Sequence, residues 1–129
     1  MKDADLIALT QKLLDSIVQG DYETYESLCA PDLTCFEPES DGHQVEGLEF
    51  HKFFFDLPSD PAVKTIVSMS GARVRHLGGT AAVVSYVRIN QTYREGGAPK
   101  ITKACETRVW VKEEHGNVWK NVHMHRSST

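Results

Sequence analysis

The spacing of the apolar residues changes near residue 63, and this change constrains the fold more than any other feature of the chain. Before it, residues such as Leu6, Leu9 and Leu13 recur at the intervals of an amphipathic helix. After it come strand-like stretches separated by short turn sequences, at 63–77, 81–93, 101–112 and 118–126. This order predicts helices first and then a meander of four long antiparallel strands.

The first 62 residues predict three helices and a short strand. Gly20 ends the first helix, because glycine readily adopts the left-handed conformation of a C-cap. Asp21 can cap a second helix over about 22–30, and 33–37 follows as a strand. A third helix, rich in phenylalanine, starts near Glu46.

These elements predict an α+β fold. A sheet of long antiparallel strands must bury one face, and the three N-terminal helices can cover it. A strongly curved sheet wrapped on a helix forms a cone with a pocket at its open end. No repeat or linker composition divides the chain, so residues 1–129 are expected to form one domain.

Composition argues against several functional classes. The net charge of −4 disfavours nucleic-acid binding, and no apolar run approaches the roughly 20 residues of a membrane span. The acidic N-terminal residues do not resemble a signal peptide. Cys29, Cys35 and Cys105 form no Cys-x-x-Cys pair, so we expect free thiols in a reducing cytoplasm. No phosphate-binding glycine loop or other cofactor motif is found, so no cofactor is expected.

Three arginines are distributed over the last three strand-like stretches. Strand alternation places Arg88 on the same face as Tyr86, and Arg108 on the same face as Glu106. We assign these faces, together with the face that carries Arg126, to the concave side. The planar fork of arginine suits bidentate capture of carboxylates and phosphates. The pattern therefore predicts a pocket for an anionic ligand.

An alternative is that acids of the chain neutralise these arginines. Glu37, Glu39 and Glu106 are the candidates for this role, which is compatible with a pocket. His51, on the third helix, is a candidate hydrogen-bond donor in the same pocket.

Alternation does not establish that the arginines converge. A hairpin count pairs Arg108 with Asn121, at a distance from Arg126. Convergence then requires strong sheet coiling or a β-bulge.

The opposite faces of the same strands are also apolar. A sheet that is apolar on both faces has to hide both, while the helices cover only one. The second face therefore predicts a subunit interface, although scattered surface valines are an alternative explanation. The candidate interface residues are Val83, Val87, Ile89, Val109, Val111 and Trp119.

Metal and catalytic motifs are weak. His123 and His125 lie two apart on one strand, but a structural metal site usually needs a third and a fourth ligand, so no metal site is expected. No pair of acid–base groups with separated pKa values is recognisable, so no catalytic residue is assigned.

Five segments in order resemble the association (hub) domain of calcium/calmodulin-dependent protein kinase II. They are FEPE at 36–39, VEGLEFHKF at 45–53, SYVRINQ at 85–91, ETRVW at 106–110 and NVHMHRS at 121–127. The resemblance implies an NTF2-like, SnoaL-like cone fold and dimers arranged into two stacked rings. It also implies that Arg88, Arg108 and Arg126 point into a deep pocket with His51 by its mouth. In that family the pocket is linked with small carboxylates and with the kinase's regulatory segment.

The chain differs from the family at some positions, and alternative functions stay open. The loop at 56–61 is shorter and richer in proline than is usual in the family, and Ala104-Cys105-Glu106 replaces a serine and two acids. The 129 residues hold no kinase domain, so an excised hub and a freestanding relative both fit. The leading hypothesis is a non-catalytic, cytoplasmic oligomerisation hub. The alternatives are a small enzyme of the ketosteroid-isomerase or SnoaL-like kind and a carboxylate sensor that adjusts assembly.

Overall fold

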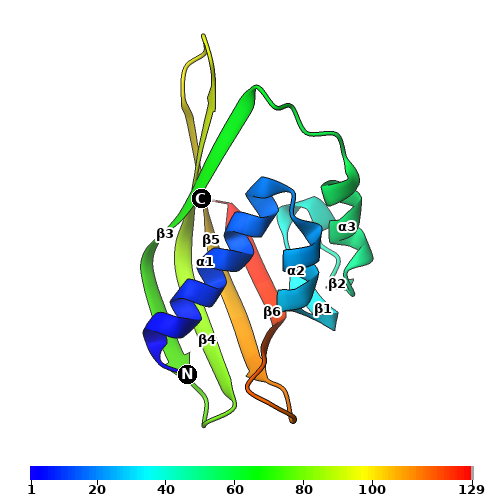
Figure 1. The fold of residues 1–129 in the computed structure, drawn as a ribbon, viewed down its shortest axis with the longest axis vertical. Coiled ribbons are helices and arrows are strands. Elements are labelled where there is room, and N and C mark those ends of the chain that lie inside the picture. The colour runs from blue at the N-terminus through cyan, green and yellow to red at the C-terminus, as the bar shows by residue number, and fades with distance from the viewer. Residues whose placement is uncertain (129) are drawn as a thin grey trace.

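The computed structural model describes residues 1–128, which form helices packed on a single curved sheet (Figure 1). The helices are α1 (Asp3–Gln19), α2 (Tyr22–Leu28) and α3 (Glu49–Asp56), with a 3-10 turn at Pro38–Ser40. The strands are β1 (Cys29–Phe36), β2 (Val45–Glu46), β3 (Val63–His76), β4 (Ala81–Arg94), β5 (Lys100–Lys112) and β6 (Trp119–Ser128). Their order in the sheet is β2-β1-β6-β5-β4-β3.

The predicted α+β class and the four-stranded meander are confirmed, whereas one detail of the N-terminal half is not, and another was not predicted. The third helix starts at Glu49, because the residues before it form β2 and pair with β1. The sheet is mixed, since β1 runs parallel to β6, with Thr34 opposite His123. The antiparallel prediction, made for the four long strands, holds for β3 to β6, whereas the direction of the β1 pairing was not predicted, because strand patterns do not specify it.

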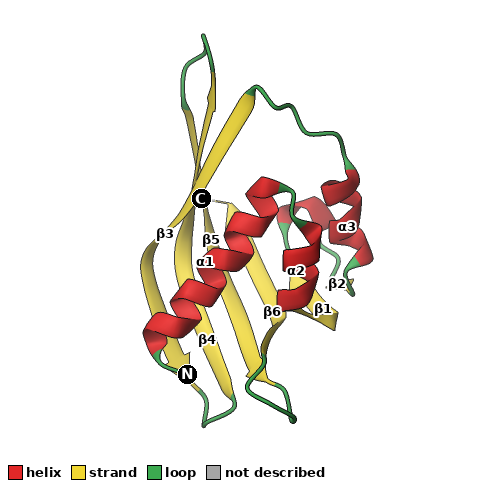
Figure 2. Cartoon of the chain, in the orientation of Figure 1, coloured by secondary structure: helices red, strands yellow, loops and turns green. Residues whose placement is uncertain are grey.

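The ends of the first two helices follow the sequence signals. Gly20 has a φ of 68° and closes α1 in the left-handed conformation. The Asp21 carboxylate accepts a hydrogen bond from the Thr24 backbone N–H at 3.2 Å, which caps α2. The tight turn between them brings α2 back beside α1, over β1 and β6 (Figure 2).

The core lies between α1 and the concave face of the sheet. Leu6, Leu13 and Leu14 of α1 are fully buried in one cluster with Val84 and Trp110. Because the apolar stripe of α1 faces the concave side of the sheet, the strands curve around this helix (Figure 1). None of the helices that the structure describes is long and apolar enough to cross a bilayer.

A β-bulge in β6 changes which residues face inward. Val109 pairs with His123 and Trp110 pairs with Asn121, so Val122 is an extra residue in β6. The Asn121 side-chain amide donates to the backbone carbonyls of Val109 and His123, both at 2.9 Å, and braces the bulge. The bulge is the irregularity that convergence of the arginines required.

The bulge also corrects the prediction for Trp119. Strict alternation placed this residue on the outer face with the interface valines, but its side chain is only 5% exposed and belongs to the core cluster. The extra residue at Val122 reverses the alternation N-terminal to it, so Trp119 and Asn121 face inward. Trp119 is therefore wrong as an interface residue.

Candidate functional site

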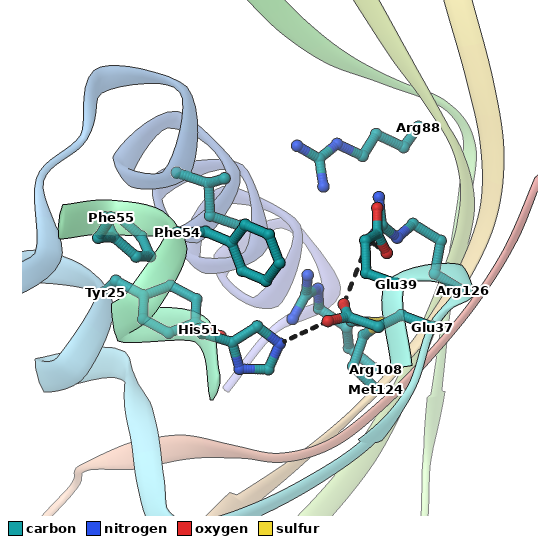
Figure 3. Close-up of a pocket in the computed structure, with 11 residues that line it drawn as sticks. Tyr25, Glu37, Glu39, His51, Phe54, Phe55, Arg88, Arg108, Met124 and Arg126 are labelled. Carbon is teal, nitrogen blue, oxygen red and sulfur yellow. Dashed lines mark hydrogen bonds and ion pairs between the residues drawn. The ribbon is translucent and has the colours of Figure 1, made fainter. Parts of the chain in front are cut away.

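A cavity of about 230 Å³ opens between α3 and the inner face of the sheet (Figure 3). The sheet and the turn after β1 supply its charged wall, and the helices supply most of its apolar and aromatic wall. The residues on the first wall include Glu37, Glu39, Arg88, Arg108 and Arg126, and those on the second include Tyr25, His51, Phe54 and Phe55.

The floor of the cavity is a buried network around Arg108. Its Nε donates to Tyr86 Oη at 2.9 Å and its Nη1 donates to Asn121 Oδ1 at 2.8 Å. The Tyr86 hydroxyl in turn donates to Glu106 Oε1 at 2.5 Å. Arg108 is only 1% exposed, so this arginine is held by the chain itself and supports the floor of the cavity.

Glu106 is the carboxylate that all three arginines share. Its oxygens lie 3.2 Å from Arg88 Nη1, 3.5 Å from Arg108 Nη2 and 3.8 Å from Arg126 Nε. The arrangement follows from register, because Glu106 is paired with Tyr86 on β4 and with Arg126 on β6. Counting back from the hairpin turn did not place Arg126 beside Glu106, because that count did not include the bulge in β6.

The rim of the cavity carries a second ionic cluster. Arg126 Nη2 donates to Glu39 Oε2 at 2.6 Å and to Glu37 Oε2 at 3.2 Å. The other Glu37 oxygen, Oε1, lies 3.1 Å from Nε2 of His51. Three arginines are thus matched by three glutamates, so the neutralisation considered from the sequence coexists with the cavity.

The pKa values of the site reflect these pairs. Burial tends to raise the pKa of Glu106, but the charges of Arg108 and Arg88 lower it below its ordinary value. Burial opposes ionisation of Glu37 in the same way, and the His51 hydrogen bond and the Arg126 charge lower its pKa. Burial raises the pKa of Tyr86 to about 12. The two glutamates are therefore ionised and weakly basic, and Tyr86 is a weak acid.

Arg88 has binding capacity to spare, as does Arg126, whose buried Nε has no hydrogen-bond partner among the described residues. The Nη1 of Arg88 contacts Glu106 and its Nε donates to Asn90 Oδ1 at 3.1 Å. No hydrogen bond links its Nη2 to any other residue among 1–128, and the guanidinium extends from the sheet towards the helices (Figure 3). An anion in the cavity can take this free donor without displacing a glutamate.

Sequence reasoning missed several residues of the site. Asn121 was placed opposite Arg108 by the hairpin count, but its place in the inner network follows from the bulge. Tyr25 and Phe55 line the cavity with ring centroids 5.0 Å apart, and the helical pattern alone did not show which aromatic residues of α3 face inward. Cys35 lies beside Glu37 and His51, with its Sγ 3.6 Å from His51 Nε2, although the sequence offered no reason to group them.

The outer face of the sheet carries the remaining predicted interface residues. Val83 lies opposite Val109, and Val87 lies opposite Cys105 on the neighbouring strand. Val83, Val87, Ile89, Val109 and Val111 are all partly exposed. Phe36 adds an aromatic ring beside His123 and His125, at centroid distances of 6.0 and 5.5 Å. The helices lie on the opposite side of the sheet (Figure 2).

The sequence and the fold are similar to those of known proteins. The chain is 38% identical over 128 residues to the delta subunit of rabbit (Oryctolagus cuniculus) calcium/calmodulin-dependent protein kinase type II, covering 97% of this chain and 23% of that protein. A solved CaMKII hub homology domain from Chlamydomonas reinhardtii is 47% identical, with a TM-score of 0.89 over 98% of this chain and 97% of the other.

A more distant structure shows the wider fold. An NTF2-like superfamily protein from Salmonella enterica superposes with a TM-score of 0.73 at 20% identity, over 98% of this chain and 89% of that protein. The NTF2-like cone is therefore confirmed. The model of the calcium/calmodulin-dependent protein kinase II association domain matches residues 2–129. This chain therefore belongs to the calcium/calmodulin-dependent protein kinase II association domain family.

Proposed function

We propose that this chain is a non-catalytic oligomerisation hub, whose subunits form dimers that assemble into stacked rings. The observation that carries the proposal is the partly apolar outer face of β4 and β5 on a chain that belongs to an association-domain family. Monomeric proteins rarely leave a large contiguous apolar surface exposed, so such a face is best explained by a subunit that covers it. We expect the hub to operate in the cytoplasm.

The contact is proposed to run along paired positions on the outer face. Val83 with Val109, and Val87 with Cys105, form two cross-strand pairs, and Ile89 and Val111 extend the surface at either end. Because dimers are commonly two-fold symmetric, the same positions of a second copy can cover this face. A contact of this kind is mainly apolar, so moderate salt is not expected to dissolve it.

The cavity is proposed to bind a small carboxylate through Arg88. At about 230 Å³ it is smaller than the roughly 300–1,000 Å³ typical of ligand pockets, which favours a short ligand or one acidic side chain of a docked segment. The free Nη2 of Arg88 supplies the donor. A kinase regulatory segment that presents an acidic side chain could bind in the same way. A small carboxylate that adjusts assembly would also bind in this cavity.

A small enzyme with a reaction chamber is less well supported. A general base needs an accessible lone pair and a pKa near the working pH. Glu37 and Glu106 are tied to arginines, and these partners lower the pKa of both. Arginine itself does not give up its proton. The charged groups of this cavity are therefore suited to holding an anion and poorly suited to proton transfer.

The native mass tests the hub directly. Light scattering coupled to size exclusion should give a mass many times the 14.4 kDa of one chain at micromolar concentration. The mass should persist when moderate salt is added. A monomer or an isolated dimer under these conditions contradicts the ring assembly.

A further inference from the structure

Three side chains with the donor types of a transition-metal site meet beside the cavity. Cys35 is the last residue but one of β1, Glu37 directly follows that strand, and His51 approaches from α3. One ligand atom from each residue lies within 4.8 Å of the other two. We propose that Cys35, Glu37 and His51 bind a divalent transition-metal ion, with Zn²⁺ as the best match.

The distances fit a tetrahedral ion. With Zn–S near 2.3 Å and Zn–N and Zn–O near 2.0–2.1 Å, a tetrahedral angle separates sulfur from nitrogen by about 3.6 Å and nitrogen from oxygen by about 3.3 Å. Cys35 Sγ lies 3.6 Å from His51 Nε2, and that nitrogen lies 3.1 Å from Glu37 Oε1. The third separation, from Cys35 Sγ to the Glu37 carboxylate, is at most 4.8 Å, and closing it to the about 3.6 Å of a tetrahedral site would seat the ion.

A proton on Nε2 of His51 is accepted well by Glu37 but only weakly by Cys35, because sulfur is a weak acceptor. If Nε2 of His51 carries a proton and donates to Glu37, it cannot accept the proton of the Cys35 thiol. If Nε2 is unprotonated and accepts from the thiol, its lone pair faces a carboxylate oxygen at 3.1 Å. A cation in place of that proton would take a lone pair from each of the three.

The shared use of Nε2 also argues against a catalytic triad. In a triad, the nucleophile and the acid contact different nitrogens of the histidine. Here both contact Nε2, and Nδ1 is buried without a partner among the described residues. Convergence of sulfur, oxygen and nitrogen on one point is the geometry of ion binding.

The surroundings support a bound cation. Glu37 offers Oε1 to the site while its Oε2 stays with Arg126 at 3.2 Å, so the arginine can orient the carboxylate from outside. Burial raises the pKa of the Cys35 thiol to about 12, so an ion bound here has to displace the thiol proton to the solvent, and the resulting thiolate and the Glu37 carboxylate balance the two charges of Zn²⁺. Glu37 and His51 also line the cavity, so an ion can enter from there and keep a fourth position for water or a ligand carboxylate. The site does not depend on the hub proposal.

Cobalt binding to the reduced, chelator-stripped native assembly tests the proposal, because Co²⁺ reports its ligands in its absorption spectrum. We expect one Co²⁺ per chain, with tetrahedral bands and a sulfur-to-cobalt charge-transfer band, and displacement by Zn²⁺. Cys35→Ser should abolish the charge-transfer band. It should also weaken Zn²⁺ binding, measured by chelator competition. Loss of a residue that only hydrogen-bonds to a metal ligand typically costs about 10–100-fold in affinity, so loss of a direct ligand should cost at least as much.

Matched variants separate this site from other thiols and from surface histidines. Cys29→Ser, at another buried cysteine, and His125→Ala, at an exposed histidine, should keep the spectrum and the affinity. If Cys35→Ser does not assemble, His51→Gln replaces it and should shift the cobalt bands and weaken Zn²⁺ binding. Absence of binding at micromolar metal overturns the proposal, as does binding that survives both Cys35→Ser and His51→Gln or is lost in His125→Ala.

Discussion

The two faces of β4 and β5 are made of alternating residues of the same strands, yet they differ in how their side chains are buried and paired. On the inner face, Tyr86, Glu106 and Arg108 are at most 5% exposed, and their polar atoms are paired within the chain. On the outer face, Val83 and Val109 are partly exposed, and the helices lie on the other side of the sheet.

The difference shows that buried charges and exposed apolar side chains are completed in different ways. Charges can be buried when the chain supplies their partners, as Glu106 does for three arginines. Apolar surface needs an area of similar size to cover it, and on the outer face we propose that another subunit supplies that area. In this account the inner face is a property of one chain, and the outer face is a property of the assembly.

The largest effect is expected from a charge on the outer face. Val109→Asp would place a carboxylate opposite Val83 in the middle of the proposed contact, where burial of an unpaired charge is costly. The mass from light scattering should fall to that of small species. Asn117→Asp, in the exposed turn between β5 and β6, adds the same charge and should keep the full mass. Full-mass assemblies of Val109→Asp would remove this face from the interface.

A smaller but substantial effect is expected on the inner face. Glu106→Gln removes the carboxylate that three arginines share, and breaking a buried ion pair in this way typically costs about 3–5 kcal/mol. The thermal midpoint, measured at one fixed chain concentration, should drop sharply. Asp56→Asn removes the exposed pair with Lys52 and should leave the thermal midpoint almost unchanged, because solvent screens such a pair. Equal effects of the two variants would mean that the inner cluster is not held by charge.

Arg88→Ala should affect binding while leaving the mass unchanged. A hydrogen bond to a charged group contributes about 1.5–3 kcal/mol, so the affinity for acetate or propionate, measured by calorimetry, should fall about tenfold or more. Arg94→Ala, at the end of the same strand and paired with Asp60 at the surface, is the matched control and should bind as the native chain does. Unchanged affinity in Arg88→Ala refutes an arginine-based site.

Acid should weaken the inner face through Glu106. Its folded-state pKa lies below the ordinary value of 4.5, so the stabilisation is fully present above that value and is lost as the pH falls through it towards the lower folded pKa. The difference in thermal midpoint between the native chain and Glu106→Gln should therefore shrink below pH 4.5. A difference that stays constant down to strongly acid pH speaks against an ionised Glu106.

Much of the fold was predictable because local signals and tertiary packing agree. The helix ends at Gly20 and Asp21, and the long strands with their turns, follow from backbone preferences of short segments. Parallel pairing of β1 with β6 was not predictable, because it depends on where a distant segment docks. The resemblance to a known family supplied the convergence of the arginines, which alternation alone did not.

The misplacement of Trp119 and that of Asn121 share one physical cause. A single extra residue, Val122, reverses the faces of β6 before it, and this moved Trp119 into the core and Asn121 into the arginine network. Because side chains in a strand alternate with a period of two, one inserted residue reverses the predicted face of every strand residue on its far side. Cys35 was missed for another reason, since its neighbours Glu37 and His51 lie just after β1 and on α3, and no spacing motif connects the three.

The reactivity of Cys105 tests the outer-face contact most directly. This thiol is exposed in the single chain and is paired with Val87 on the outer face, whereas Cys29 and Cys35 are buried in the chain itself. In the native assembly, alkylation of Cys105 followed by mass spectrometry should be slow, and in Val109→Asp it should become fast. Rapid modification of Cys105 in the full assembly, at the rate of a free thiol, would contradict the central claim that another subunit covers this face.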